Sequence, residues 1–223
     1  PDNSGGLNDA LNVIPVSIGY QPFPNAVDFS GAAAETINSV FVAKWGTEVI
    51  IFAGGATKLF KFNNTTEALE DKSKSGGYSS TFSWKFVQFG KTVIAVNGNA
   101  IIQYWTIGTS TAWADIATSP VARQVAVVRD FVVTGYVNTG TLGNSTVQWS
   151  DINDETDWTA GATSQADNQV IPDGGNIQAV TGGEFGLILL EKSISRMSYV
   201  GSPLFFQFDN ISRGLGCLNG NSV

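Results

Sequence analysis

The chain has 223 residues, of which 43% are hydrophobic and 14% charged, a composition typical of a well-buried globular protein and not of a disordered one. Its net charge of −7 and its scattered Lys and Arg residues argue against the basic face of a dedicated nucleic-acid binder and against binding to an anionic membrane. It has no histidine, which excludes Ser-His-Asp and Cys-His catalysis and histidine-based metal sites, and its single cysteine, Cys217, excludes an internal disulfide.

Residues 1–30 are predicted to form an extended N-terminal arm. The stretch 12–24 contains three prolines, each of which lacks a backbone donor and disfavours helix at the residue before it. The apolar side chains of this arm are its predicted contacts with a neighbouring subunit or partner: Val16, Ile18, Tyr20 and Phe23. The alternative is that the segment packs on its own domain.

Residues 31–223 are predicted to be all-β and repetitive. Twenty-five glycines and an aromatic content of 11% favour short strands joined by tight turns. An apolar strand recurs four times, at 48–53, 92–97, 131–136 and 185–190. The residues that open these strands are spaced 44, 39 and 54 positions apart: Gly46, Gly90, Arg129 and Gly183.

Each apolar strand belongs to a longer repeat. The repeats cover about 36–75, 83–119, 123–165 and 176–212. In each, one strand precedes the apolar strand, at 37–44, 83–89, 123–128 and 176–181, and one follows it, at 58–62, 100–105, 146–150 and 193–199. A short fourth strand is expected around 69–71, 113–116, 149–152 with Trp158, and 208–211. The tryptophans Trp113, Trp149 and Trp158 are expected in the core.

These repeats predict a β-propeller. Repeats of about 44 residues are typical of propellers, in which one unit cannot bury its apolar faces alone. Four repeats are visible, and 213–223 reads as the start of a further element, so we expect an incomplete or larger propeller whose C-terminal end is truncated. The alternative is a β-sandwich, since it also gives evenly spaced short strands.

One acidic segment, 151–157, has some features of a calcium site. Its oxygen-bearing side chains at alternate positions could hold calcium, but the glycine and the final glutamate of an EF-hand loop are missing. The alternative is a loop whose Asp and Asn side chains bond their own backbone. No metal or cofactor is therefore predicted, and Asp151, Asn153, Asp154 and Asp157 are predicted as partner contacts.

No catalytic residue is predicted, and the chain is not expected to be an enzyme. A glycosidase needs two carboxylates that face each other across a cleft, for which Asp173, Glu184 and Glu191 are the candidates. A sialidase also needs clustered arginines, and the chain has four that could contribute: Arg123, Arg129, Arg196 and Arg213. A carbohydrate-binding or glycosidase-like propeller stays the alternative, followed by a general protein-binding propeller.

Several motifs resemble a family of virion proteins. The sequence reads VQWSDINDETDW at 147–158, GGEFGLILLEKSISRMSYVG at 182–201 and FFQFDNI at 205–211. The N-terminal motifs are NVIPVS at 12–17 and YQPFP at 20–24. Together these are similar to the packaged-DNA stabilisation proteins, or tail hub (nozzle) proteins, of short-tailed bacteriophages, while 55–125 matches only as repeats.

The resemblance implies a structural virion protein of the phage tail, assembled in the cytoplasm of the bacterial host. It implies a homo-oligomeric ring, a hexamer in the family, below the portal or adaptor ring at the portal vertex. Such a ring extends and closes the DNA channel, retains the packaged genome until ejection and supports tail spikes, fibres or a needle. An acidic wall is consistent with DNA that slides past it without tight binding.

Overall fold

The computed structural model describes residues 11–25, 27–79 and 82–220. All regular secondary structure within these residues is β-strand, which confirms the all-β prediction. None of the described segments forms a helix of the length and apolarity needed to span a bilayer.

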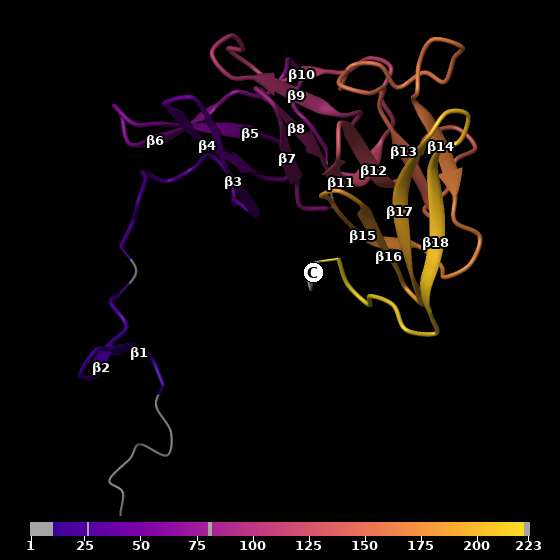
Figure 1. Cartoon of the computed structure of the whole chain (residues 1–223). Helices are drawn as coiled ribbons and strands as arrows, with labels where there is room; N and C mark the ends of the chain where they lie inside the picture. The colour runs from indigo at the N-terminus through magenta and orange to yellow at the C-terminus, as the bar shows by residue number, and fades with distance from the viewer. Residues whose placement is uncertain (1–10, 26, 80–81, 221–223) are drawn as a thin grey trace, which may run out of the picture.

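The N-terminal segment forms a hairpin and not a single extended strand. β1 (Val13–Val16) pairs antiparallel with β2 (Gly19–Pro22), and Gly19 follows the turn with a positive φ of 94°. The hairpin projects away from the remaining sheets (Figure 1). Residues 1–10 and 26 of the predicted arm lie outside the described residues.

The body consists of four antiparallel sheets, each of four strands in simple sequential order. Sheet I contains β3 (Ser39–Trp45), β4 (Glu48–Gly54), β5 (Leu59–Asn63) and β6 (Ala68–Asp71). Sheet II contains β7 (Lys85–Phe89), β8 (Thr92–Val96), β9 (Gln103–Thr106) and β10 (Ala114–Asp115). Sheet III contains β11 (Ala122–Val128), β12 (Phe131–Val137), β13 (Thr146–Trp149) and β14 (Asp167–Val170). Sheet IV contains β15 (Ile177–Thr181), β16 (Gly186–Leu190), β17 (Ser193–Gly201) and β18 (Phe205–Arg213).

One predicted strand was wrong. The fourth strand of the third repeat was expected around 149–152, with Trp158, but Trp149 ends β13 and the fourth strand is β14. All four residues of β14 are exposed, and β14 is held by its register with β13, such as Trp149 opposite Asp167. Its polar sequence carries no apolar alternation, so pairing with a neighbour and not burial makes it a strand.

Three of the four residues that open the apolar strands lie in tight turns, whereas Gly183 lies in a longer turn, between the paired Thr181 and Leu187. Gly46, Gly90 and Arg129 have φ of 60°, 57° and 51°, the left-handed region that a two-residue hairpin turn requires at its first position. The strands that follow them, β4, β8 and β12, pair with the strands before, β3, β7 and β11. The spacing of these three residues in the sequence therefore marks the turn between the first and second strands of sheets I, II and III.

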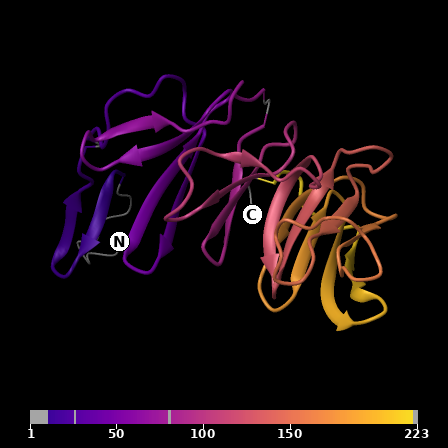
Figure 2. The same ribbon diagram turned by 90° about the horizontal axis from the view of Figure 1, so that it is seen from above.

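The sheets pack face to face in chain order along an open arc (Figure 2). The first strands of successive sheets lie side by side, β3 by β7, β7 by β11 and β11 by β15. A parallel bridge between Val128 and Gly183 joins sheets III and IV directly. In the described residues sheet IV does not return to pack on sheet I, so no closed ring forms.

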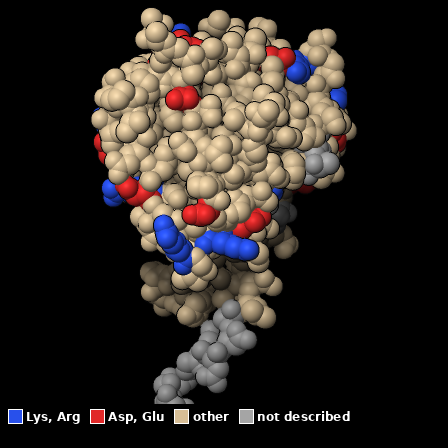
Figure 3. Space-filling view, turned by 90° about the vertical axis from the view of Figure 1, so that its right-hand side faces the viewer, with Lys and Arg blue, Asp and Glu red and all other residues tan. Residues whose placement is uncertain are grey.

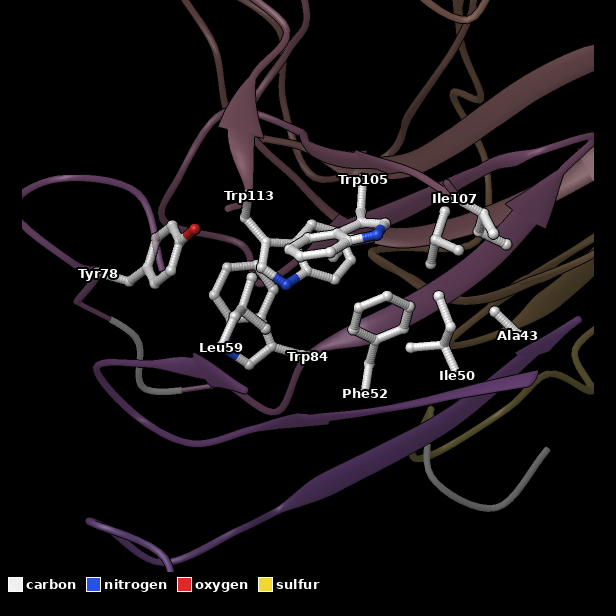
Figure 4. Close-up of a cluster of buried hydrophobic side chains, with 11 residues drawn as sticks. Ala43, Ile50, Phe52, Leu59, Tyr78, Trp84, Trp105, Ile107 and Trp113 are labelled. Atoms are coloured by element: carbon white, nitrogen blue, oxygen red, sulfur yellow. The ribbon is translucent and has the colours of Figure 1, made fainter. Parts of the chain in front are cut away.

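Three apolar clusters fill the spaces between the sheets. The first, between sheets I and II, is aromatic: Phe52 meets Trp105 and Trp113 edge-on at ring-centroid distances of 5.3 and 5.0 Å (Figure 4). The second lies between sheets II and III and includes Trp158, and the third lies between sheets III and IV and includes Trp149. The prediction that Trp113, Trp149 and Trp158 belong to the core is confirmed.

The C-terminal segment 214–220 returns from β18 toward the centre of the arc (Figure 1). The Gly214 and Cys217 amides donate to the carbonyls of Lys192 and Leu190, and Gly220 packs against Gln178. The segment contains no strand within the described residues, whereas the sequence predicted the start of a further element there.

Candidate interaction surfaces

The hairpin presents the predicted apolar contacts to solvent. Ile18 is 93% exposed, and Val16, Tyr20 and Phe23 are also exposed. Large apolar side chains grouped on a projecting element are typical of an interaction site. A two-stranded hairpin alone is only marginally stable in water, so a partner that covers these side chains would also stabilise the element.

The acidic loop 151–158 lies between β13 and β14 and closes on itself. The Asp151 amide donates to the Asp157 carbonyl at 2.8 Å, and the Trp158 indole donates to the Glu155 carbonyl at 2.8 Å. Asn153 has a φ of 56° and donates its amide to the Asp130 carbonyl. The loop is therefore anchored to sheet III through its backbone and through the buried ring of Trp158.

The carboxylates of this loop accept hydrogen bonds from its own backbone and from the segment that follows it. Asp151 accepts from the amide of Gln165, and Asp157 accepts from the amide of Thr159. Asp154 accepts from the hydroxyl and the amide of Thr156, and these hydrogen bonds lower the pKa of Asp154 below its ordinary value. The described residues contain no group of three side chains suited to a metal ion. The observed bonding matches the alternative of a loop bonded to its own backbone.

The structure does not bring the two predicted contact regions together. The hairpin precedes sheet I, whereas the 151–158 loop belongs to sheet III and contacts the connection between β10 and β11, where Thr118 donates its hydroxyl to the carbonyl of Thr156. They form two separate surfaces.

Two of the candidate carboxylates for glycosidase chemistry lie apart, whereas Asp173 lies near Glu191, since the Asp173 carbonyl accepts from the hydroxyl of Ser193. Glu184 and Glu191 lie at opposite ends of β16, so they do not face each other across a cleft. Glu191 accepts from the side-chain amide of Asn176 at 2.9 Å, and Glu184 forms an ion pair with Arg129 at 3.6 Å.

Three of the arginines lie over different aromatic rings. Arg123 lies 4.2 Å from the ring centroid of Phe82, Arg129 5.0 Å from Tyr199 and Arg196 5.7 Å from Phe185. Guanidinium groups stacked in this way stabilise loops and strands locally. The fourth candidate arginine, Arg213, lies at the end of β18.

Sequence reasoning missed a polar cluster between sheets I and II. Lys74 forms an ion pair with Asp115 at 2.7 Å, Gln103 donates to the same carboxylate, and the buried Tyr78 hydroxyl donates to Gln103 at 3.0 Å. Burial raises the pKa of Tyr78, so its hydroxyl stays protonated as a donor. Burial acts to raise the pKa of Asp115 as well, but the hydrogen bonds from Lys74 and Gln103 outweigh it and the pKa is lowered. The cluster ties the connection between the two sheets to strands β9 and β10.

The side formed by the outer strands of sheets III and IV carries few charges (Figure 3). Charged side chains gather toward the lower edge of this view, and uncharged residues fill most of it. A groove of about 330 Å³ runs here between β14 and β18, and its walls include Val170, Phe206, Phe208 and Arg213. The groove is open and shallow, which suits contact with another protein surface better than enclosure of a small ligand.

Comparison with known proteins identifies no family: no family model and no curated protein matches this chain. Among solved structures, the chain resembles the extracellular domain of the putative hybrid two-component system BT4673 from B. thetaiotaomicron, with a TM-score of 0.56 and 12% identity. The match covers 84% of this chain and 23% of that one. A second similar structure is BBS1N in complex with ARL6DN, with a TM-score of 0.49, 10% identity and coverage of 88% of this chain and 61% of that one. At these identities the likeness to the first structure concerns the fold alone.

Proposed function

We propose that this chain is a structural subunit of a phage tail, a hub or nozzle protein that forms a homo-oligomeric ring below the portal. In this role it extends and closes the DNA channel, retains the packaged genome and supports spikes, fibres or a needle. It acts through assembly and carries no catalytic site.

The observation that carries this proposal is the run of family-like sequence at 182–211. These residues form a continuous part of the molecule, from the end of β15 through β16 and β17 into β18. The other strong motif, 147–158, supplies the end of β13 and the loop anchored by Trp158. Both motifs thus coincide with ordered structural units of sheets III and IV.

We also propose that the four sheets are blades of a β-propeller. The strand order within each sheet is sequential, and the first strands of successive sheets are neighbours at the inner side of the arc, as in a propeller. The face-to-face stacking is equally a property of a β-sandwich, but two packed sheets would account for only half of this body.

The surface properties support contact with proteins more than with nucleic acid. The net charge is −7, and the broad side in Figure 3 is mostly uncharged. A surface of this kind offers DNA no set of phosphate contacts, so a genome could pass it without being held. The exposed hairpin supplies apolar contacts for a neighbouring subunit or for the ring above.

Light scattering of the chain mixed with purified portal-ring complex tests this proposal. We expect a stoichiometric ring of copies to add to the portal. The triple variant Ile18→Ser, Tyr20→Ser, Phe23→Ser should weaken this binding and leave the body folded, whereas Leu204→Ser, which changes an exposed side chain in the turn between β17 and β18, should bind as the unchanged chain does. A chain that ignores the portal but binds in a glycan screen would overturn the proposal in favour of a carbohydrate-binding propeller.

A further inference from the structure

The groove between β14 and β18 lies where the outer strands of sheets III and IV approach each other (Figure 1). Its lining includes Ile171 and Phe206, which are mostly buried, and Phe206 meets Trp149 edge-on at a ring-centroid distance of 5.1 Å. Val170 and the partly buried Phe208 also line it. Both sheets that form the groove belong to the described body, so its opening does not depend on a further neighbouring sheet.

Two polar side chains that line this groove have no partner within the described residues. Ser195 is only 3% exposed, yet no described residue bonds to its hydroxyl. Asn210 lies opposite Ser195 on the neighbouring strand, and its side-chain amide is likewise unbonded in this part of the chain. Buried polar groups in proteins are nearly always hydrogen-bonded, so an unpartnered hydroxyl at the wall of a groove indicates a partner that the chain itself does not supply.

Arg213 adds a positive charge to the lining of the groove at the end of β18. Arg129 and Arg196 each lie against a carboxylate, whereas the exposed Arg213 forms no ion pair in the described part of the chain. Asp173 is the one carboxylate among the residues that line the groove, and it does not pair with this guanidinium. An unpaired guanidinium beside apolar side chains suits a carboxylate on an otherwise apolar ligand, because charge-assisted hydrogen bonds are stronger where water is partly excluded.

The two strands beside the groove also have free backbone edges. β14 and β18 are each the last strand of a sheet, so among the described residues no strand is paired to their outer edge. β18 has nine residues and β14 has four, which makes β18 the longer template for an added strand. An extended peptide on such an edge gains main-chain hydrogen bonds, and every second side chain of the peptide lies over the same face.

We infer that the groove binds an extended segment of a partner protein, which adds to sheet IV as a further strand beside β18. Apolar side chains of the segment lie over Phe206 and Phe208, and an Asp or Glu side chain of the segment pairs with Arg213. Ser195 and Asn210 supply hydrogen bonds from the wall. A small ligand fits less well because the groove is open and shallow, and a nucleic acid would meet a single unpaired arginine. This inference goes beyond the proposed function, because it needs neither a ring nor a portal.

The test uses a fluorescent probe peptide, blocked at both ends, in which valine and threonine alternate between a glutamate at each end. The two glutamates allow for either direction of the added strand. Fluorescence anisotropy measures binding of this peptide to the whole chain. We expect saturable binding, and binding about tenfold weaker for the same peptide with glutamine in place of both glutamates, because the charge-assisted pair is then lost.

Variants of the chain assign the binding to the groove. Arg213→Gln should weaken binding of the glutamate peptide about tenfold and leave binding of the glutamine peptide unchanged. Arg196→Gln is the matched control: Arg196 follows Ser195 on β17, so its side chain lies on the opposite face of sheet IV, and this variant should bind both peptides as the unchanged chain does. Ser195→Ala should weaken binding of both peptides without lowering the melting temperature, because no described residue bonds to the hydroxyl that is removed.

Three results would overturn the inference. The first is the absence of saturable binding at millimolar peptide. The second is equal affinity for the two peptides, or an Arg213→Gln chain that binds the glutamate peptide as the unchanged chain does. The third is self-association of the unchanged chain that Arg213→Gln abolishes, measured by native mass, since this would assign the groove to a second copy. Circular dichroism confirms that the variants are folded.

Discussion

Replacement of Phe52 by alanine should weaken the body at the junction of sheets I and II. Phe52 is fully buried and its ring meets the edges of Trp105 and Trp113, so the substitution removes a large apolar side chain from the most aromatic cluster of the protein (Figure 4). Substitutions of this kind cost about 3–5 kcal/mol, because the cavity left behind closes only in part. Since natural domains are stable by about 5–15 kcal/mol, this is a large part of the total free energy of unfolding.

A second substitution separates the free-energy contribution of the ring contacts from that of the buried volume. Phe52→Leu keeps an apolar side chain in place but removes both edge contacts, and two such contacts contribute about 1–3 kcal/mol together. Urea unfolding followed by tryptophan fluorescence measures both losses, because Trp105 and Trp113 report on this cluster directly. Phe23→Ala, which changes an exposed ring of the hairpin, should alter the free energy of unfolding by less than about 0.5 kcal/mol. A loss below about 1 kcal/mol for Phe52→Ala would refute the assignment of this cluster as the main support of the junction.

Three further results are expected. In thermal unfolding, Gly135→Ala should lower the free energy of unfolding by about 1–3 kcal/mol, because its added methyl group would lie 2.7 Å from a side-chain carbon of Val180 in sheet IV. Gly143→Ala, which has open space around it, should leave the free energy of unfolding nearly unchanged in the same assay. Asp115→Asn should reduce the loss of folding stability in acid. The pKa of Asp115 is lowered by folding, so its carboxylate contributes stability above the unfolded pKa of about 3.9, and this contribution is lost as the pH falls through the folded pKa. If the stability of the variant depends on pH as that of the unchanged chain does, the assigned ion pair is contradicted. Calcium should leave the melting temperature unchanged, because the carboxylates of 151–158 accept from backbone amides, and a saturable rise with added calcium would show a metal site there.

The sequence predicted most strands because apolar runs and turn residues mark them locally. Gly46 and Gly90 occupy left-handed turns, and the strands on either side of them lie close to the expected ranges. The fourth strand of sheet III escaped prediction because β14 is polar and exposed and gains its structure only by pairing with β13. Trp158 drew the prediction to the wrong segment, since it belongs to the core but to no strand.

The packing of the sheets was harder to predict from the sequence than the strands were. All five residues of β8 are buried, so alternation cannot tell which of its faces meets which neighbour. The exposure of the hairpin side chains could be predicted, because prolines and the absence of a longer strand pattern set this segment apart. The cluster of Lys74, Gln103 and Asp115 could not, because the fold brings together residues from three separate segments.

The central claim is that copies of this chain surround the DNA channel below a portal. Electron cryomicroscopy of the chain assembled with portal-ring complex tests it most directly. We expect a ring of four-sheet bodies, coaxial with the portal and arranged side by side around an open channel. Density for single copies scattered on the portal surface, or a portal with no added density at all, would contradict it.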